Sequence, residues 1–112
     1  MRCIHATLVV AICLTATAIS AIADDNTSGP SGQTVFETNC ANCHTGGFGG
    51  FFTSAPDVDD PEDWESLAPK GVESLTASTL AGIGDMAPRG GCATCTDEEI
   101  QAAVAYMLEK SQ

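Results

Sequence analysis

Residues 40–44 read Cys40-Ala41-Asn42-Cys43-His44, a C-x-x-C-H motif. This spacing is typical of covalent c-type haem attachment, because two thiols three positions apart can each add to a haem vinyl group. The adjacent His then lies under the ring plane, with an imidazole nitrogen facing the iron. The chain has two His, and His5 lies in a segment that we expect to be removed, so His44 is the only imidazole left. The motif therefore predicts one covalently attached haem c with His44 as an axial ligand.

The first 23 residues have the form of a secretory signal peptide. Arg2 gives a short positive start, residues 6–22 are apolar without a charge, and Ala21-Ile22-Ala23 matches an A-x-A cleavage site. The alternative is an uncleaved anchor, since the apolar run approaches the roughly 18 residues that can span a bilayer. We expect cleavage before Asp24, a periplasmic location, and no stable membrane association of the mature protein.

The mature protein would be small and strongly acidic. Removal of 23 of the 112 residues leaves 89, enough for one domain, which we place at 32–112 after a flexible lead-in at 24–31. All 15 acidic residues and three of the four basic ones lie after the cleavage site, which gives a formal charge of −12. Such a charge repels nucleic acid and anionic membranes and attracts basic partners. Solubility in a salty exterior would explain the same composition.

The N-terminal half of the domain predicts one helix and then a loop. A helix is expected to begin near Ser31 or Gly32 and to run through Cys40 into the haem motif. Residues 45–60 are rich in Gly and Phe, and we expect a loop there without helical period. Its aromatic side chains are expected to shelter the haem edge, with a surface docking role as the alternative; they are Phe48, Phe51 and Phe52.

The C-terminal half predicts three further helices. Asp60 is a plausible N-cap for a short helix that starts at Pro61, and residues 71–81 predict a second short helix. Thr96 and Glu99 have the spacing of a capping box at the start of the last helix. The apolar stripe of that helix comprises Ile100, Ala103, Val104, Met107 and Leu108. Because no run of residues predicts a strand, we expect an all-α fold.

The sixth iron ligand has few candidates. Only Met86 and Met107 remain after signal removal, and Met107 falls on the apolar stripe, where a Met usually fills the core. Met86 lies in a loop rich in Gly and Pro, which permits the backbone to approach the iron. We therefore expect His44 and Met86 as the axial pair, which raises the reduction potential and suits electron transfer.

A second C-x-x-C pair occurs at Cys92-Ala93-Thr94-Cys95. Together with Cys40 and Cys43 it could form a four-cysteine zinc site, but the two pairs lie farther apart than in most zinc ribbons. A redox-active pair is a further alternative. In an oxidising compartment a disulfide between Cys92 and Cys95 is the expected outcome.

These features resemble the class I c-type cytochromes, and among them the small bacterial cytochrome c-five type. The resemblance covers about residues 32–108, and its most specific stretch is 86–95, where a ligand Met precedes a C-x-x-C pair. It implies that the first and last helices cross with Tyr106 at the crossing. It also implies that the Pro56 carbonyl holds the ligand imidazole. Trp64 would lie near the haem propionates, with core packing as the alternative.

Two departures from the resemblance concern the surface. The segment after the haem motif looks longer than in close relatives, and Glu65-Ser66-Leu67 stands where relatives tend to have a basic residue. Both departures bear on partner choice and on the propionates, whereas the axial ligands are unaffected.

The sequence therefore predicts a periplasmic electron carrier rather than an enzyme. It would pass single electrons between respiratory redox proteins. Partners with a basic docking face would bind around its exposed haem edge. The rivals are a haem-based sensor or peroxidase-like domain with a labile sixth ligand, and a haem-free zinc or disulfide module. The oligomeric state is left open.

Overall fold

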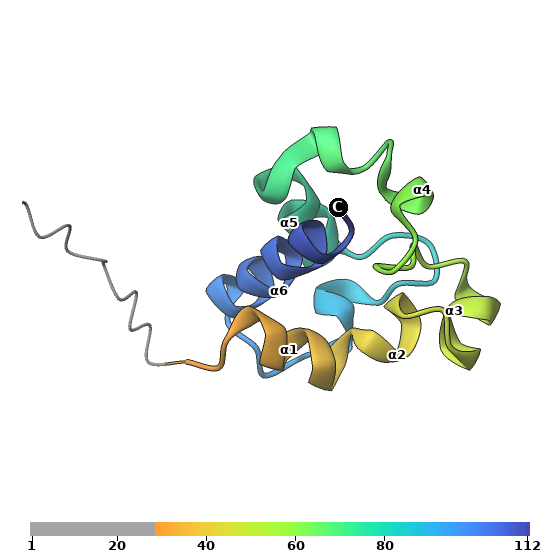
Figure 1. Cartoon of the computed structure of the whole chain (residues 1–112). Helices are drawn as coiled ribbons and strands as arrows, with labels where there is room; N and C mark the ends of the chain where they lie inside the picture. Colours follow the sequence, from red (N-terminus) through yellow and green to blue (C-terminus); the bar gives the residue numbers. More distant parts are fainter. Residues whose placement is uncertain (1–28) are drawn as a thin grey trace, which may run out of the picture.

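The computed structural model describes residues 29–112, and these fold into helices joined by short turns (Figure 1). The helices are α1 Gly32–Asn39, α2 Ala41–His44, α3 Phe48–Thr53, α4 Pro61–Trp64, α5 Gly71–Ala81 and α6 Asp97–Lys110, with 3₁₀ turns at Ala68–Lys70 and Pro88–Gly91. Within this range the β-structure is limited to an isolated bridge between Ile83 and Met86. The all-α expectation is confirmed. The expected signal peptide and most of the lead-in lie outside the described residues.

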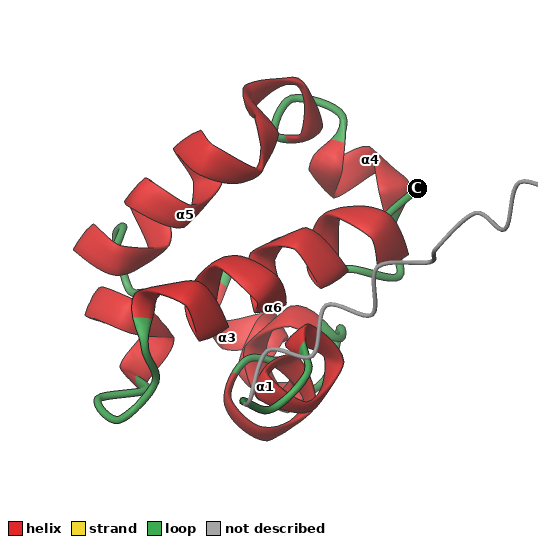
Figure 2. Cartoon of the chain, turned by 90° about the vertical axis from the view of Figure 1, so that its left-hand side faces the viewer, coloured by secondary structure: helices red, strands yellow, loops and turns green. Residues whose placement is uncertain are grey.

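The first and last helices of this range pack against each other at close range, as Figures 1 and 2 show. Gly32 lies directly on the backbone of α6: a Cβ there would stand 2.5 Å from the carbonyl carbon of Ala102. One turn later, the rings of Phe36 and Tyr106 pack with centroids 5.3 Å apart. Tyr106 therefore lies at the helix crossing, where the family resemblance places an aromatic residue.

The core forms around the apolar stripe of α6. One buried cluster joins the haem-motif half of the chain to α6 and comprises Val35, Phe36, Val58, Trp64, Ala103, Met107 and Leu108. A second cluster comprises Cys92, Ile100 and Val104, with side chains of α5 packed against it. All five residues predicted for the stripe are buried. Since α6 contributes to both clusters, it connects the two halves of the domain.

The helix starts follow the expected capping chemistry. The Asp60 side chain accepts the backbone N–H of Glu62 at the start of α4, which confirms the predicted cap. Thr96 and Glu99 form both hydrogen bonds of the capping box at α6. The predicted helix at 71–81 has the bounds of α5. Among the described residues no helix is long and apolar enough to cross a membrane.

Two predictions about the N-terminal half are wrong. The helix does not run unbroken into the haem motif, since α1 ends at Asn39 and α2 begins after Cys40. Residues 45–60 are not all loop, because α3 occupies Phe48–Thr53. The physical reason lies in the spacing of Phe48, Phe51 and Phe52, which is i, i+3, i+4 and places all three on one helix face. The adjacent glycines let α3 lie close to α2, as described below.

Candidate functional site

The two thiols of the haem motif flank the short helix α2. Cys40 and Cys43 are both free and half-buried. The backbone N–H groups of Cys43 and His44 both donate to the Cys40 carbonyl, each at 3.1 Å, so the three residues share one tight turn. Burial raises the pKa of the Cys40 thiol, and the neighbouring Cys43 raises it further. The pair is thus held one turn apart, with Cys40 protonated at neutral pH.

His44 is buried and fixed at both its ring and its backbone. Nδ1 lies 2.8 Å from the Pro56 carbonyl oxygen. Because a carbonyl can only accept, Nδ1 carries the proton in this contact, and the lone pair of neutral imidazole lies on Nε2. The His44 carbonyl also accepts the N–H of fully buried Val58 at 2.9 Å. This arrangement orients the ring and leaves Nε2 as the nitrogen whose lone pair is available to a metal ion.

Met86 lies half-buried in the turn between α5 and the Pro88–Gly91 turn. Its backbone pairs with that of Ile83 in both directions, at 2.8 and 3.1 Å. Gly82 has φ +81°, and a Cβ there would stand 2.8 Å from the Met86 carbonyl oxygen. A side chain at position 82 would therefore collide with the turn, so glycine is required for the backbone to hold Met86 in place.

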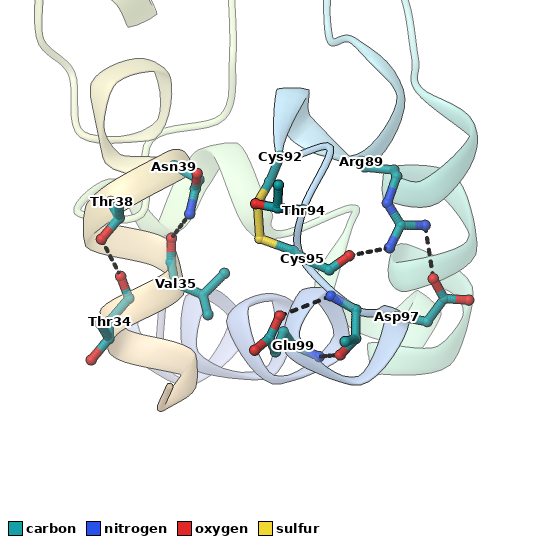
Figure 3. The surroundings of a disulfide bond; sticks show 11 residues. Thr34, Val35, Thr38, Asn39, Arg89, Cys92, Thr94, Cys95, Asp97 and Glu99 are labelled. Carbon is teal, nitrogen blue, oxygen red and sulfur yellow. Dashed lines mark hydrogen bonds and ion pairs between the residues drawn. A yellow bond between two sulfur atoms is a disulfide. The ribbon is translucent and has the colours of Figure 1, made fainter. Parts of the chain in front are cut away.

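The second cysteine pair forms a disulfide in this structure. Cys92 and Cys95 are joined with their Cα atoms 5.5 Å apart (Figure 3). Because their sulfur atoms are bonded to each other, these residues are not free to bind zinc together with Cys40 and Cys43. In residues 29–112 no group of three or more His, Cys, Asp or Glu side chains is arranged to hold a metal ion.

Arg89 fastens this loop to the start of α6 and was not predicted as a structural residue. Its guanidinium donates to the Cys95 carbonyl at 2.6 Å and to Asp97 Oδ1 at 2.7 Å (Figure 3). The residue has φ +62°, a left-handed conformation that is unusual for a residue with a side chain. The sequence signal was an Arg between Pro and Gly, eight residues before an Asp, and that signal is weak.

Trp64 packs in the core, which the sequence analysis gave as the alternative to a position near the haem propionates. It is buried, and its indole N–H donates to the Asp57 carbonyl at 2.8 Å. Asp57 was not singled out from the sequence, yet its N–H donates to Asp63 Oδ2 at 2.9 Å. Asp57 thus links the segment after Pro56 to α4. The expected contact of Trp64 with the haem propionates stays a prediction.

The chemistry of these donors fits a covalently attached haem. Two free thiols stand one turn apart, and the next residue offers a buried imidazole whose Nδ1 contacts the Pro56 carbonyl, which leaves Nε2 available as a ligand. A thioether lies on a separate, well-fixed turn. Thiols that form thioether bonds, together with imidazole and thioether ligands for iron, are the protein groups that such a haem requires.

Comparisons with known proteins point to the same chemistry. Residues 27–107 match the family model described as cytochrome C oxidase, cbb3-type, subunit III. Cytochrome c5 of Azotobacter vinelandii is 37% identical over 79 residues, which are 69% of this chain and 90% of that protein.

Two solved structures share the fold. One is a chain in the crystal structure of an electron transfer complex of nitrite reductase with cytochrome c; it has TM-score 0.66 and 33% identity and covers 75% of this chain and 98% of that chain. The other is a monohaem ferrocytochrome c from Shewanella putrefaciens, with TM-score 0.58 and 34% identity. The match covers 70% of this chain and 93% of that chain. The chain therefore belongs to the small class I c-type cytochromes of the cytochrome c5 type, which carry one covalently bound haem c and transfer electrons rather than act as enzymes.

Proposed function

We propose that this cytochrome is a periplasmic carrier of single electrons with His44 and Met86 as its axial ligands. The bound haem supplies the ferrous/ferric couple. Cys40 and Cys43 hold the group through thioether bonds, and the buried His44 ring coordinates the iron through Nε2. The protein itself transforms no substrate, because its residues only hold, orient and shield the redox group.

The observation that carries the proposal is the contact between His44 Nδ1 and the Pro56 carbonyl oxygen at 2.8 Å. It fixes the tautomer and the orientation of the His44 ring beside two free thiols. A disulfide or zinc module would not need an imidazole fixed in this way. A hydrogen bond of this kind also increases the basicity of the coordinating nitrogen.

The choice of Met86 rests on the position of both mature methionines. Met107 is buried in the core on α6, packed with Phe36 and Leu108 in one cluster. Met86 is half-buried on a turn that two backbone hydrogen bonds to Ile83 hold in place. A thioether ligand favours ferrous iron and raises the reduction potential, and a six-coordinate site changes little when an electron is gained.

The test compares Met86→Leu with Met107→Leu in the haem-loaded protein. Met86→Leu is expected to abolish the weak far-red sulfur-to-iron band of the ferric spectrum and to lower the reduction potential. Met107→Leu conserves volume in the core, so both properties should stay at their wild-type values. A far-red band that survives Met86→Leu, or one that vanishes in Met107→Leu, would overturn the ligand assignment.

Export to the periplasm is part of the proposal. The support is an uncharged apolar run before an A-x-A sequence, followed by a domain with a disulfide, which forms in oxidising compartments. Mass spectrometry of the mature protein should give a chain that begins at Asp24. We place the lead-in of this chain at 24–31 and the cytochrome domain at 32–112. A chain that retains residues 1–23 would indicate an uncleaved anchor.

Partners are proposed to be redox proteins with a basic docking face. One structural neighbour was solved as an electron transfer complex with nitrite reductase. The formal charge of −12 after signal cleavage favours a basic partner surface. The interface is expected to be small and transient, below about 1,200 Å². Electron transfer to such a partner should slow as salt screens the charges over a Debye length of about 8 Å.

A further inference from the structure

Helix α3 carries three exposed aromatic side chains. Phe48, Phe51 and Phe52 are 83%, 82% and 65% exposed. Their rings pack on one another, with centroids 4.7 Å apart for Phe48 and Phe52 and 5.4 Å apart for Phe51 and Phe52. We call these three residues the aromatic patch. Single exposed apolar residues are common, whereas the largest contiguous apolar patch on a small protein is often functional.

The two faces of α3 have different roles. At about 100° per residue, the three Phe side chains cluster on one face, roughly opposite Gly49 and Gly50. A Cβ at Gly50 would stand 2.7 Å from the Cys43 carbonyl oxygen, and one at Gly49 would stand 3.1 Å from the carbonyl carbon of Asn42. The glycine face thus lies directly on α2, and the aromatic face points away from it. This orientation favours docking over the expected shelter of the haem edge.

The patch lies next to the haem attachment segment. In Figure 1, α3 lies beside α2 at the edge of the domain, away from the packed pair of α1 and α6. Because Gly50 contacts the backbone of Cys43, a partner seated on the patch would come close to the residues that hold the haem. Electron transfer requires such proximity, whereas long-lived binding is not needed.

The size of the patch is that of a transient contact. A Phe side chain presents about 200 Å², so the exposed fractions amount to roughly 450 Å² of aromatic surface. A stable dimer buries about 800 Å² on each partner. The patch is therefore too small to hold two copies of this chain together, and the charge of about −12 on each copy would oppose their association.

An acidic segment follows α3 in the chain, and one of its carboxylates lies close to the start of α3. The Asp57 carboxylate lies against Gly46, two residues before α3 begins, and residues 57–65 contain six of the acidic residues. Lys110, the one basic residue paired with this segment, forms its ion pair with Asp59. An apolar contact flanked by carboxylates is complementary to an apolar surface flanked by Lys or Arg.

We propose that the aromatic patch is the docking surface for a redox partner protein whose contact face is apolar at its centre and basic at its margin. The inference rests on the proposed electron-carrier function and adds the contact residues and the partner's surface chemistry. The apolar centre supplies adhesion, and the charges supply orientation and a fast encounter.

Two redox-inert, paramagnetic cations of equal charge serve as probes of the haem-loaded ferrous protein. Tris(phenanthroline)chromium(III) presents aromatic surface, and hexaamminechromium(III) presents none. In NMR titrations kept in the dark, the aromatic complex should broaden the backbone amide signals of α3, which all the variants retain, at concentrations at least tenfold lower than the ammine complex. The variant with all three Phe changed to Ser should lose this difference, and the variant with all three changed to Leu should keep most of it.

Stopped-flow oxidation by tris(phenanthroline)cobalt(III) gives the functional readout. One electron passes from ferrous haem to cobalt(III), which becomes cobalt(II). The triple Ser variant should react at least tenfold more slowly with its optical spectrum unchanged, and Asp57→Asn should slow the reaction more than Glu98→Gln on α6.

The outcomes separate the two proposals. If the wild type transfers electrons and the triple Ser variant matches it in rate and NMR titration, the docking surface is wrong and the carrier function stands. A wild type that passes no electron refutes the carrier function itself. Patch-dependent dimers in analytical ultracentrifugation, or patch-dependent binding to phosphatidylcholine vesicles, would assign the patch to a second copy or a lipid surface and would also overturn the proposal.

Discussion

Gly32→Ala tests the close approach of α1 and α6, on which the position of the haem motif depends. A Cβ at position 32 would stand 2.5 Å from the Ala102 carbonyl carbon and 3.2 Å from the Ala103 nitrogen. Carbon atoms in contact normally lie about 3.5–4.0 Å apart, so the helices would have to separate by about 1 Å. The obstacle is backbone within α6, which cannot rotate away as a side chain could.

Two effects of opposite sign decide the magnitude. Replacing Gly by Ala in a helix ordinarily stabilises a protein by about 0.5–1 kcal/mol. Overpacking a well-packed contact costs about 1–3 kcal/mol, and the separation would also loosen the ring contact of Phe36 with Tyr106. We therefore expect Gly32→Ala to lower the free energy of unfolding by about 1–2 kcal/mol.

The assay is guanidinium unfolding of the haem-loaded protein, followed by helical circular dichroism. Gly47→Ala is the matched control, because a Cβ there meets no atom within 4 Å and the backbone φ of −72° suits any residue. The control should lose no more than about 0.5 kcal/mol: Gly47 is the N-cap of α3, where Ala is less favourable than Gly, but the new Cβ makes no close contact. A Gly32→Ala protein as stable as the control would refute the close approach of the two helices.

Three further predictions concern the loop between α5 and α6 and the end of α6. Replacing Cys92 and Cys95 together by Ala should lower the free energy of unfolding by about 2 kcal/mol, because the disulfide closes only a short loop, and the ferric far-red band should persist; loss of the band would show that the disulfide holds the turn that carries Met86, the proposed ligand. Arg89→Gln should cost about 1 kcal/mol through its hydrogen bonds to the Cys95 carbonyl and Asp97, and an unchanged denaturation midpoint would contradict that role. The hydrogen bond from Lys110 to Asp59 raises the pKa of Lys110 above its ordinary 10.5, so its stabilising effect is present below that pH and lost as the pH rises further. The melting-temperature gap between wild type and Lys110→Gln should therefore be small and should close above pH 10.5; a gap that widens there would have the wrong sign.

The sequence predicted best the features that depend on local chemistry. The capping box of Thr96 and Glu99, the Asp60 cap and the bounds of α5 follow from side chains acting on backbone within a few residues. The position of the haem motif likewise follows from a fixed spacing. The contact between His44 and Pro56 spans twelve residues, and only the family resemblance suggested it.

The sequence predicted least where glycine decides the packing. Residues 46–52 looked like a loop because four glycines lower helix propensity, yet the Phe spacing already had a helical period. Tertiary contact outweighs that propensity, since Gly49 and Gly50 allow α3 to lie directly on α2. The same residues that weaken the helix thus make its position possible and turn the aromatic side chains outward. A glycine-rich stretch with aromatic residues at i, i+3 and i+4 is therefore better interpreted as a helix that packs through its glycine face than as a loop.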